Sequence, residues 1–201
     1  MIRDLREYSP DTTVQADICV IGAGAAGITL ARELASGNRQ ICLVDGGGLD
    51  YGFPDSQELY QGESVGAPVS LIGGRLRFLG GSTNHWGGRC APLQEIDFRR
   101  REWIAHSGWP FDRRELDPYY ARARVMAGFP SNWLSDPATL AALNDSLPAI
   151  DTARILPFLW HYTPATPGFA GWNWGKAYKS VLQDSPHINT LLHANFTAFS
   201  T

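Results

Sequence analysis

The chain has 201 residues, which suffices for one domain or two small ones by the rough guide of about 150 residues per domain. Its 17 Lys and Arg residues against 20 Asp and Glu residues give a net charge of −3, which argues against a nucleic-acid-binding or polybasic membrane protein. A content of 44% hydrophobic and 18% charged residues excludes a disordered chain, and 21 Gly with 13 Pro predict many tight turns. We therefore expect a globular, loop-rich protein.

The cysteines and the longest uncharged run indicate in which cellular compartment the protein lies and whether it crosses a membrane. Cys19, Cys42 and Cys90 have no CxxC spacing, so we predict neither a disulfide framework nor a metal site, and we expect Cys19 and Cys42 to be small core residues of strands. The amino terminus lacks the apolar core of a signal peptide. Residues 155–175 are uncharged but contain three prolines, which would break a membrane-spanning helix. These features predict a cytoplasmic protein without a transmembrane segment.

The first predicted elements form a strand–helix–strand unit. Residues 17–21 are an apolar run that ends at glycine, and residues 25–36 have apolar side chains at helical spacing. Gly37 suits the end of that helix, and residues 40–45 repeat the pattern of a buried strand. The sequence therefore predicts a βαβ unit.

The rest of the chain predicts less regular structure. Glycine-punctuated loops are expected at 46–55 and 70–89, short helices between 112 and 146, an irregular aromatic segment at 155–175, a helix at 176–183 and a strand from Ile188. No second βαβ unit follows the first one directly.

The sharpest motif is GAGAAG, residues 22–27, because its Gly-x-Gly-x-x-Gly spacing lies between a predicted strand and a predicted helix. Gly22 permits a tight turn, Gly24 lets the backbone approach a pyrophosphate, and Gly27 allows close helix–strand packing. Asp45 ends the next strand, where a carboxylate can accept a hydrogen bond from a ribose hydroxyl. The alternative is a glycine-rich turn without a ligand. The cofactor-binding residues predicted from this region are Gly22, Ala23, Gly24, Ala25, Ala26, Gly27 and Asp45.

A second glycine region, RFLGGSTNHWGG at residues 77–88, resembles the flavin-contacting loop of the glucose-methanol-choline (GMC) oxidoreductases. The order of features is also similar to that family: the dinucleotide motif, VDGGG at 44–48, this loop, SGWP at 107–110 and LDPYY at 116–120. The resemblance covers most of the chain. It implies an α/β fold, an FAD-binding Rossmann-like domain that is incomplete and carries a long, mostly irregular and helical insertion.

The same resemblance assigns cofactor contacts to the second loop. His85 follows the second glycine by four residues, and in the pyranose oxidase branch of the family, which this loop resembles most, a histidine at that spacing attaches the flavin covalently. The alternative is that His85 is a hydrogen-bonding loop residue near the flavin. The side chains of Ser82 to Asn84 suit the flavin or satisfy the loop backbone. The predicted contacts are Gly80, Gly81, Ser82, Thr83, Asn84 and His85.

The resemblance implies an oxidoreductase that uses FAD to oxidise a CH–OH group of a sugar or another alcohol, with hydride passing to flavin N5. Members of the family carry their catalytic histidine in a carboxy-terminal segment that has no counterpart here, so the chain is expected to be an amino-terminal fragment and inactive by itself. Two alternatives are a non-catalytic dinucleotide-binding remnant and an NAD-dependent dehydrogenase. The expected domains are a partial FAD-binding domain, 14–50 with 187–201, and an insertion, 51–186. The catalytic residues and an electron-accepting subunit are left unidentified.

Overall fold

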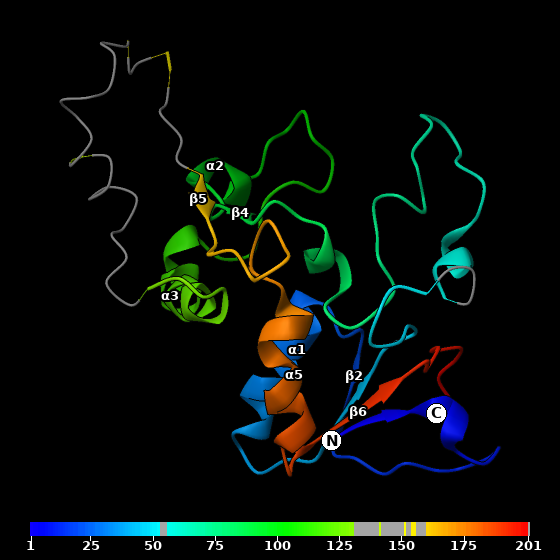
Figure 1. Cartoon of the computed structure of the whole chain (residues 1–201). Helices are drawn as coiled ribbons and strands as arrows, with labels where there is room; N and C mark the ends of the chain where they lie inside the picture. Colours follow the sequence, from blue (N-terminus) through cyan, green and yellow to red (C-terminus); the bar gives the residue numbers. More distant parts are fainter. Residues whose placement is uncertain (53–55, 131–140, 142–150, 152–153, 156–159, 201) are drawn as a thin grey trace. The chain divides into compact units, whose positions relative to one another are not determined.

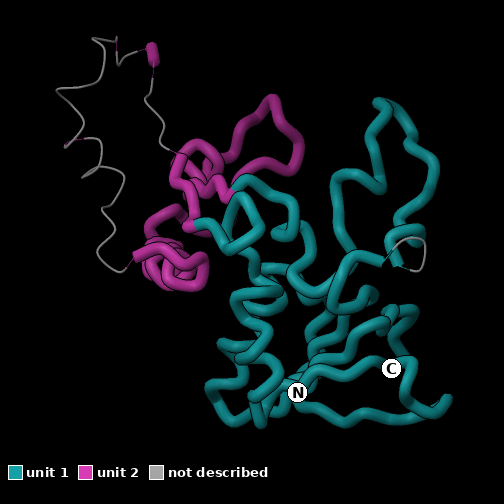
Figure 2. The backbone as a smooth tube through the Cα atoms, viewed as in Figure 1, with its two compact units in different colours: residues 1–87, 165–201 teal, residues 88–164 magenta. Residues whose placement is uncertain are grey.

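The computed structural model describes residues 1–52, 56–130, 141, 151, 154–155 and 160–200. Two compact units make up the chain: residues 1–87 with 165–201, and residues 88–164 (Figure 2). The first unit contains the predicted βαβ unit and also residues 51–87 and 165–186, which we expected to belong to the insertion. The division of the chain by function stays a prediction.

The first unit is built on a parallel sheet of four strands in the order β1-β6-β3-β2. The strands are β1 (Ile2–Asp4), β2 (Ile18–Ile21), β3 (Ile41–Val44) and β6 (Ile188–Leu192). The predicted strands at 17–21, 40–45 and from 188 are confirmed, and the last two pair directly. Strand β1 was not predicted, since three residues are too few to show a hydrophobic period. The α/β fold class with a parallel Rossmann-like sheet is confirmed.

Helices α1 (Ala25–Ala35) and α5 (Trp174–Asp184) lie side by side on one face of this sheet (Figure 1). In α1 the fully buried residues are Ile28 and Ala31, one turn apart. In α5 the buried side chains recur every four residues, at Trp174, Tyr178 and Leu182. Each helix therefore forms because one apolar stripe is covered by the sheet.

The opposite face of the sheet is covered by the first residues of the chain. A small apolar cluster lies on this face, formed by the buried residues Cys42, Leu191 and Ala194. The partly buried side chains that pack against it are Leu5, of the 3-10 helix η1 (Leu5–Glu7), Tyr8, Val14 and Val44. Our prediction for Cys42 is therefore confirmed. The prediction for Cys19 is wrong, because β2 lies at the edge of the sheet and Cys19 is exposed.

The second unit contains mostly short elements. Strands β4 (Arg89–Cys90) and β5 (His161–Tyr162) pair antiparallel, and the helices are α2 (Glu95–Phe98), the 3-10 helix η4 (Arg113–Leu116) and α3 (Asp117–Met126). Phe98, Trp109 and Phe111 form an aromatic cluster with ring centroids 5.5 to 6.3 Å apart. Predicted helix positions at 136–146 lie almost wholly outside the described residues. In the described part of the chain, no helix has the length and apolar character needed to cross a bilayer.

Candidate functional site

The first glycine motif forms the turn between β2 and α1. Gly22 has a φ of +100°, which a residue with a side chain rarely adopts, and its N–H donates to the carbonyl of Val44 at 2.7 Å. Gly24 is the N-cap of α1, and the first bond of the helix runs from the N–H of Ile28 to its carbonyl at 3.0 Å. The turn therefore joins the carboxyl ends of β2 and β3 to the start of α1.

The start of α1 is open. A Cβ atom added to Gly24 would meet nothing within 4 Å, and no side chain caps the helix there. Helix geometry leaves the N–H groups of Ala25, Ala26 and Gly27 without intrahelical acceptors. Together with the helix dipole, these groups make a site where an anion such as a pyrophosphate is stabilised.

Gly27, in contrast, faces inward. A Cβ atom on Gly27 would overlap the carbonyl oxygen of Gly22 and would lie 3.6 Å from the side chain of Val20. This contact is the close approach of helix and strand that the third glycine of the motif predicts. Gly27 therefore acts on packing, and Gly24 leaves room for a ligand.

Asp45 directly follows β3 and is buried. Its Oδ2 accepts a hydrogen bond from the N–H of Ala23 at 2.7 Å, and its Oδ1 accepts one from the N–H of Gly47 at 2.9 Å. The carboxylate therefore ties the first glycine motif to the end of β3, a role that we did not predict. Each oxygen of an ionised carboxylate has a second acceptor position, so the predicted bond to a ribose hydroxyl is compatible with these contacts.

The second glycine loop reaches the first motif. The N–H of Gly80 donates to the carbonyl of Ala23 at 2.8 Å, and Gly24 and Gly80 form an isolated parallel bridge. A Cβ atom on Gly81 would lie 3.2 Å from the Cα of Gly24. Two glycine motifs that are far apart in the sequence therefore meet where α1 begins, and the φ of +95° at Gly80 favours a glycine on the side of the second loop.

Two predicted contacts of the second loop are engaged within the protein. Thr83, in the 3-10 helix η3 (Gly81–Asn84), donates from Oγ1 to the carbonyl of Gly80 at 2.6 Å and accepts from the N–H of Trp174 at 3.2 Å. The Nδ2 of Asn84 donates to the carbonyls of Leu79 at 3.1 Å and Gly81 at 2.7 Å. These bonds match the alternative in which such side chains satisfy the loop backbone.

Asn173 completes this network and was missed by the sequence analysis. It is fully buried; its Oδ1 accepts from the N–H of Lys176 at 2.8 Å, and its Nδ2 donates to Oδ1 of Asn84 at 2.7 Å. Asn173 is thus the N-cap of α5 and the link between α5 and η3. The sequence does contain a signal for this role: Asn173 precedes the predicted helix at 176–183 by three residues, and asparagine is a preferred N-cap residue.

Ser82 and His85 are exposed. The backbone N–H of His85 donates to the carbonyl of Ser82 at 3.3 Å and ends η3. The next residue, Trp86, is anchored: its Nε1 donates to the carbonyl of Trp172 at 2.9 Å, and its ring lies 5.7 Å from that of Trp174. The loop therefore holds its backbone in place while the imidazole of His85 stays accessible.

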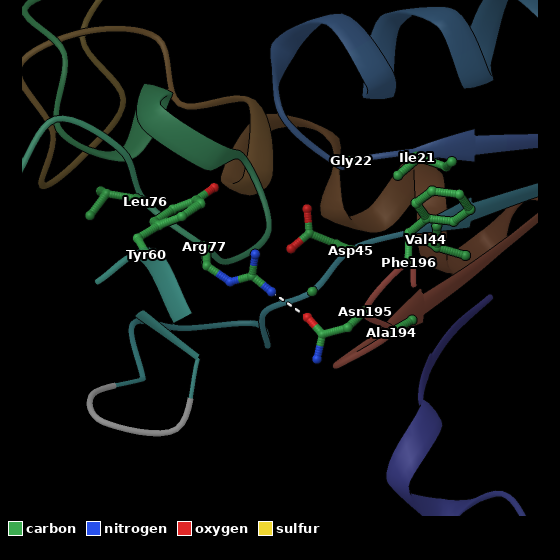
Figure 3. A pocket seen from close by; sticks show the side chains of 11 residues that line it. Ile21, Gly22, Val44, Asp45, Tyr60, Leu76, Arg77, Ala194, Asn195 and Phe196 are labelled. Atoms are coloured by element: carbon green, nitrogen blue, oxygen red, sulfur yellow. Dashed lines mark hydrogen bonds between the residues drawn. The ribbon is translucent and has the colours of Figure 1, made fainter. Parts of the chain in front are cut away.

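A pocket of about 210 Å³ opens at the carboxyl ends of β2, β3 and β6 (Figure 3). Asp45 lines it together with apolar residues such as Ile21 and Phe196. Arg77 also lines it; its Nη2 donates to Oδ1 of Asn195, and its guanidinium carbon lies 5.1 Å from the centre of the Tyr60 ring. The volume is below the range of about 300–1,000 Å³ of pockets for whole ligands, so the pocket suits one part of a larger molecule.

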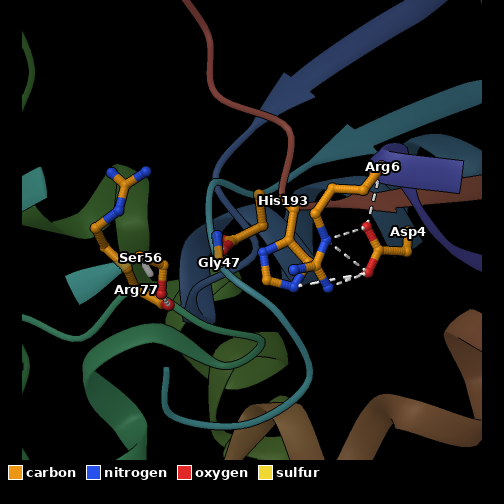
Figure 4. Close-up of polar contacts among 7 residues, drawn as sticks. Asp4, Arg6, Gly47, Ser56, Arg77 and His193 are labelled. Carbon is orange, nitrogen blue, oxygen red and sulfur yellow. Dashed lines mark hydrogen bonds and ion pairs between the residues drawn. The ribbon is translucent and has the colours of Figure 1, made fainter. Parts of the chain in front are cut away.

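The glycine run after β3 contacts His193, which lies beside the ion pair of Asp4 and Arg6 (Figure 4). The N–H of His193 donates to the carbonyl of Gly47 at 2.8 Å, and its Nε2 lies 3.7 Å from Oδ2 of Asp4. Arg6 forms an ion pair with Asp4 at 2.6 Å. Hydrogen bonds from Arg6, with a smaller contribution from His193, lower the pKa of Asp4 from 3.8 to about 2.

Comparison with known proteins identifies several curated relatives. No protein-family model matches the chain. It is similar to proteins named oxygen-dependent choline dehydrogenase: those of Rhizobium johnstonii and Rhizobium meliloti are 27% identical to it over 137 residues, and that of Sinorhizobium fredii is 26% identical. Each alignment covers 60% of this chain and 25% of the relative.

The chain thus spans about a quarter of the length of the curated relatives that it matches. The similarity supports the resemblance to the GMC oxidoreductases that the two glycine motifs indicate. It gives no support to the pyranose oxidase branch in particular.

Proposed function

We propose that this chain is the FAD-binding part of a GMC-type oxidoreductase that oxidises a CH–OH group of an alcohol. The observation that carries the proposal is the contact of two glycine motifs, at Gly24 and Gly80, in front of the open start of α1. A glycine-rich turn without a ligand needs neither the open space at Gly24 nor a second glycine loop beside it. The similarity to choline dehydrogenases supports the same reading.

In this proposal the residues of the first motif bind the cofactor. The N–H groups of residues 25–27 face the pyrophosphate, and the space beside Gly24 lets it approach the backbone. Asp45 accepts a hydrogen bond from the adenosine ribose, and the small pocket beside it takes the adenosine end. The residues therefore fit a dinucleotide. When bound, FAD supplies the acceptor for the hydride that leaves the alcohol carbon.

The second loop has a different proposed role. Gly80 and Gly81 bring the backbone of the loop next to the first motif, and the bonds of Thr83 and Asn84 hold it there. Ser82 and His85 project from this fixed backbone and are the side chains of the loop left for contact with the flavin. We assign residues 14–50 and 187–201 to FAD binding and residues 51–186 to the insertion.

Covalent attachment of the flavin through His85 is a separate part of the proposal. Acid precipitation of the flavin-loaded full-length protein, followed by mass analysis of the peptide that contains His85, measures it directly. Flavin mass on this peptide, absent in His85→Ala, supports the bond. Release of all FAD into the supernatant restricts His85 to a non-covalent contact.

The substrate is proposed to be an alcohol, and the names of the relatives make choline the first compound to test beside a set of sugars. The cofactor is tested by titrating the purified chain with FAD and, in parallel, with NAD. FAD binding is measured by the quenching of flavin fluorescence, and binding of either cofactor by the rise in thermal stability. Saturable FAD binding with no NAD binding supports the proposal. NAD binding without FAD binding favours the NAD-dependent dehydrogenase.

A second measurement separates an enzyme from a binding remnant. The full-length protein, loaded with FAD under anaerobic conditions, is mixed with choline or a sugar, and the flavin absorbance is followed. Bleaching that depends on the alcohol supports the oxidoreductase. Bound flavin that none of these alcohols reduces favours the non-catalytic alternative.

A further inference from the structure

Two cysteines lie side by side on neighbouring strands of the sheet of the first unit. Cys19 in β2 and Cys42 in β3 are register partners on neighbouring parallel strands. Partners in register project from the same face of a sheet. Both cysteines lie on the face that the first residues of the chain cover, because Cys42 packs there against Leu191 and Ala194.

The two thiols differ in their access to solvent. Cys42 is buried, with 7% of its surface exposed, whereas Cys19 is exposed on the edge strand. Burial, and to a lesser degree the neighbouring Cys19 thiol, raises the pKa of Cys42 to about 11. A reagent in solution therefore meets Cys19 first, and Cys42 is the second thiol to react.

The spacing of the strands suits a bond between them. Neighbouring strands lie about 4.7–4.9 Å apart. Disulfides join residues whose Cα atoms are about 4.4–6.8 Å apart, and the general spacing of register partners on neighbouring strands falls within this range. Cys90 is in the second unit, where its register partner is His161, so it has no thiol opposite.

We propose that Cys19 and Cys42 are a redox-sensitive pair that a small-molecule disulfide, such as oxidised glutathione, converts into an intramolecular disulfide. The Cys19 sulfur attacks one sulfur of the reagent, forms a mixed disulfide and releases one glutathione thiol. The Cys42 sulfur then attacks the Cys19 sulfur and releases the second glutathione. The two protein thiols lose two electrons and two protons, and both are recovered in two molecules of glutathione.

The bond would act on the elements that build the candidate site. Cys19 precedes Gly22 by three residues, and Cys42 precedes Asp45 by three residues. A disulfide here joins the strand that leads into the first glycine motif to the strand that ends at Asp45. The inference concerns these strands alone and does not depend on FAD being the ligand.

The experiment uses the purified chain without flavin. It is incubated with oxidised glutathione, its remaining thiols are alkylated, and the protein is digested without reduction for peptide mass analysis. We expect one alkylated thiol, at Cys90, and a peptide pair joined through Cys19 and Cys42. The matched control Cys90→Ser forms the same joined pair. Cys19→Ser removes an exposed thiol, so it keeps the fold and yields no joined pair.

Three results overturn the proposal: three alkylated thiols after treatment, glutathione retained on Cys19 while Cys42 is still alkylated, or a bond between two chains in place of the internal one. Reduction with dithiothreitol must return all three thiols, because the pair is proposed to be reversible. Failure of FAD to bind leaves each of these readouts unchanged, which separates this test from that of the proposed function.

Discussion

The glycine motif at residues 22–27 and the loop at residues 80–85 meet at Gly24 and Gly80, but they expose different groups. The first motif presents backbone: an open space beside Gly24 and the free N–H groups of the first turn of α1. The second loop turns two polar side chains inward: Thr83 bonds to backbone, and Asn84 bonds to backbone and to Asn173, whereas Ser82 and His85 are exposed. A motif that resembles a ligand-binding loop can therefore owe part of its sequence to packing.

The largest expected effect is on stability, at the inward-facing glycine of the first motif. Gly27→Ala places a Cβ atom against the carbonyl oxygen of Gly22, and this backbone clash cannot be relieved by a rotamer change. We expect a loss of about 3 kcal/mol, at the upper end of the cost of overpacking, measured by urea unfolding. Gly37→Ala, where the nearest atom lies at 3.7 Å, is the control. Equal stability of the two variants would contradict the assigned packing role of Gly27.

The second prediction concerns the side chains that hold the second loop. Asn173→Ala removes the N-cap of α5 and leaves Oδ1 of Asn84 without its partner, so we expect a loss of about 2 kcal/mol. A double-mutant cycle with Asn84→Ala measures the link between α5 and η3. A coupling energy of about 1 kcal/mol is expected. Strict additivity of the two substitutions would show that the loop is held by other contacts.

The third prediction separates binding from stability. Gly24→Val projects into open space, so we expect stability to change by less than about 1 kcal/mol while FAD affinity falls at least about tenfold. Gly37→Val is the matched control, because Gly37 lies beyond the other end of α1, has no positive φ and has its nearest atom at 3.7 Å. FAD affinity is measured by fluorescence titration. Unchanged affinity in Gly24→Val would contradict the proposal that the pyrophosphate lies beside Gly24.

The smallest expected effect is a pH dependence at the edge of the site. The pKa of Asp4 is lowered to about 2 in the folded protein from its ordinary 3.8, so its ionised form stabilises the fold above about pH 4. This contribution is lost as the pH falls from about 4 to 2, where the carboxylate takes up a proton in both states. Urea midpoints across this range should fall less in Asp4→Asn. Parallel midpoints for the two proteins would contradict the assignment.

Local patterns were sufficient for β2, α1 and β3 of the first unit, but not for the short strand β1. The period of 25–36, the glycine turn before it and the apolar runs at 17–21 and 40–45 each depend on neighbours within a few residues, and the structure contains all of them. The strand from Ile188 was also recognised. Its place beside β3, however, depends on hydrogen bonds between residues that are almost 150 positions apart in the sequence.

The sequence by itself determined the βαβ unit, the two glycine motifs and the position of Asp45 at a strand end. Only the tertiary structure decided that Gly80 reaches Ala23, that Asp45 bonds to Ala23 and Gly47, and that Cys19 is exposed. These features depend on groups far apart in the chain and on which strand lies at the sheet edge. Periodicity and spacing report on neighbours along the chain, so they carry no record of such contacts.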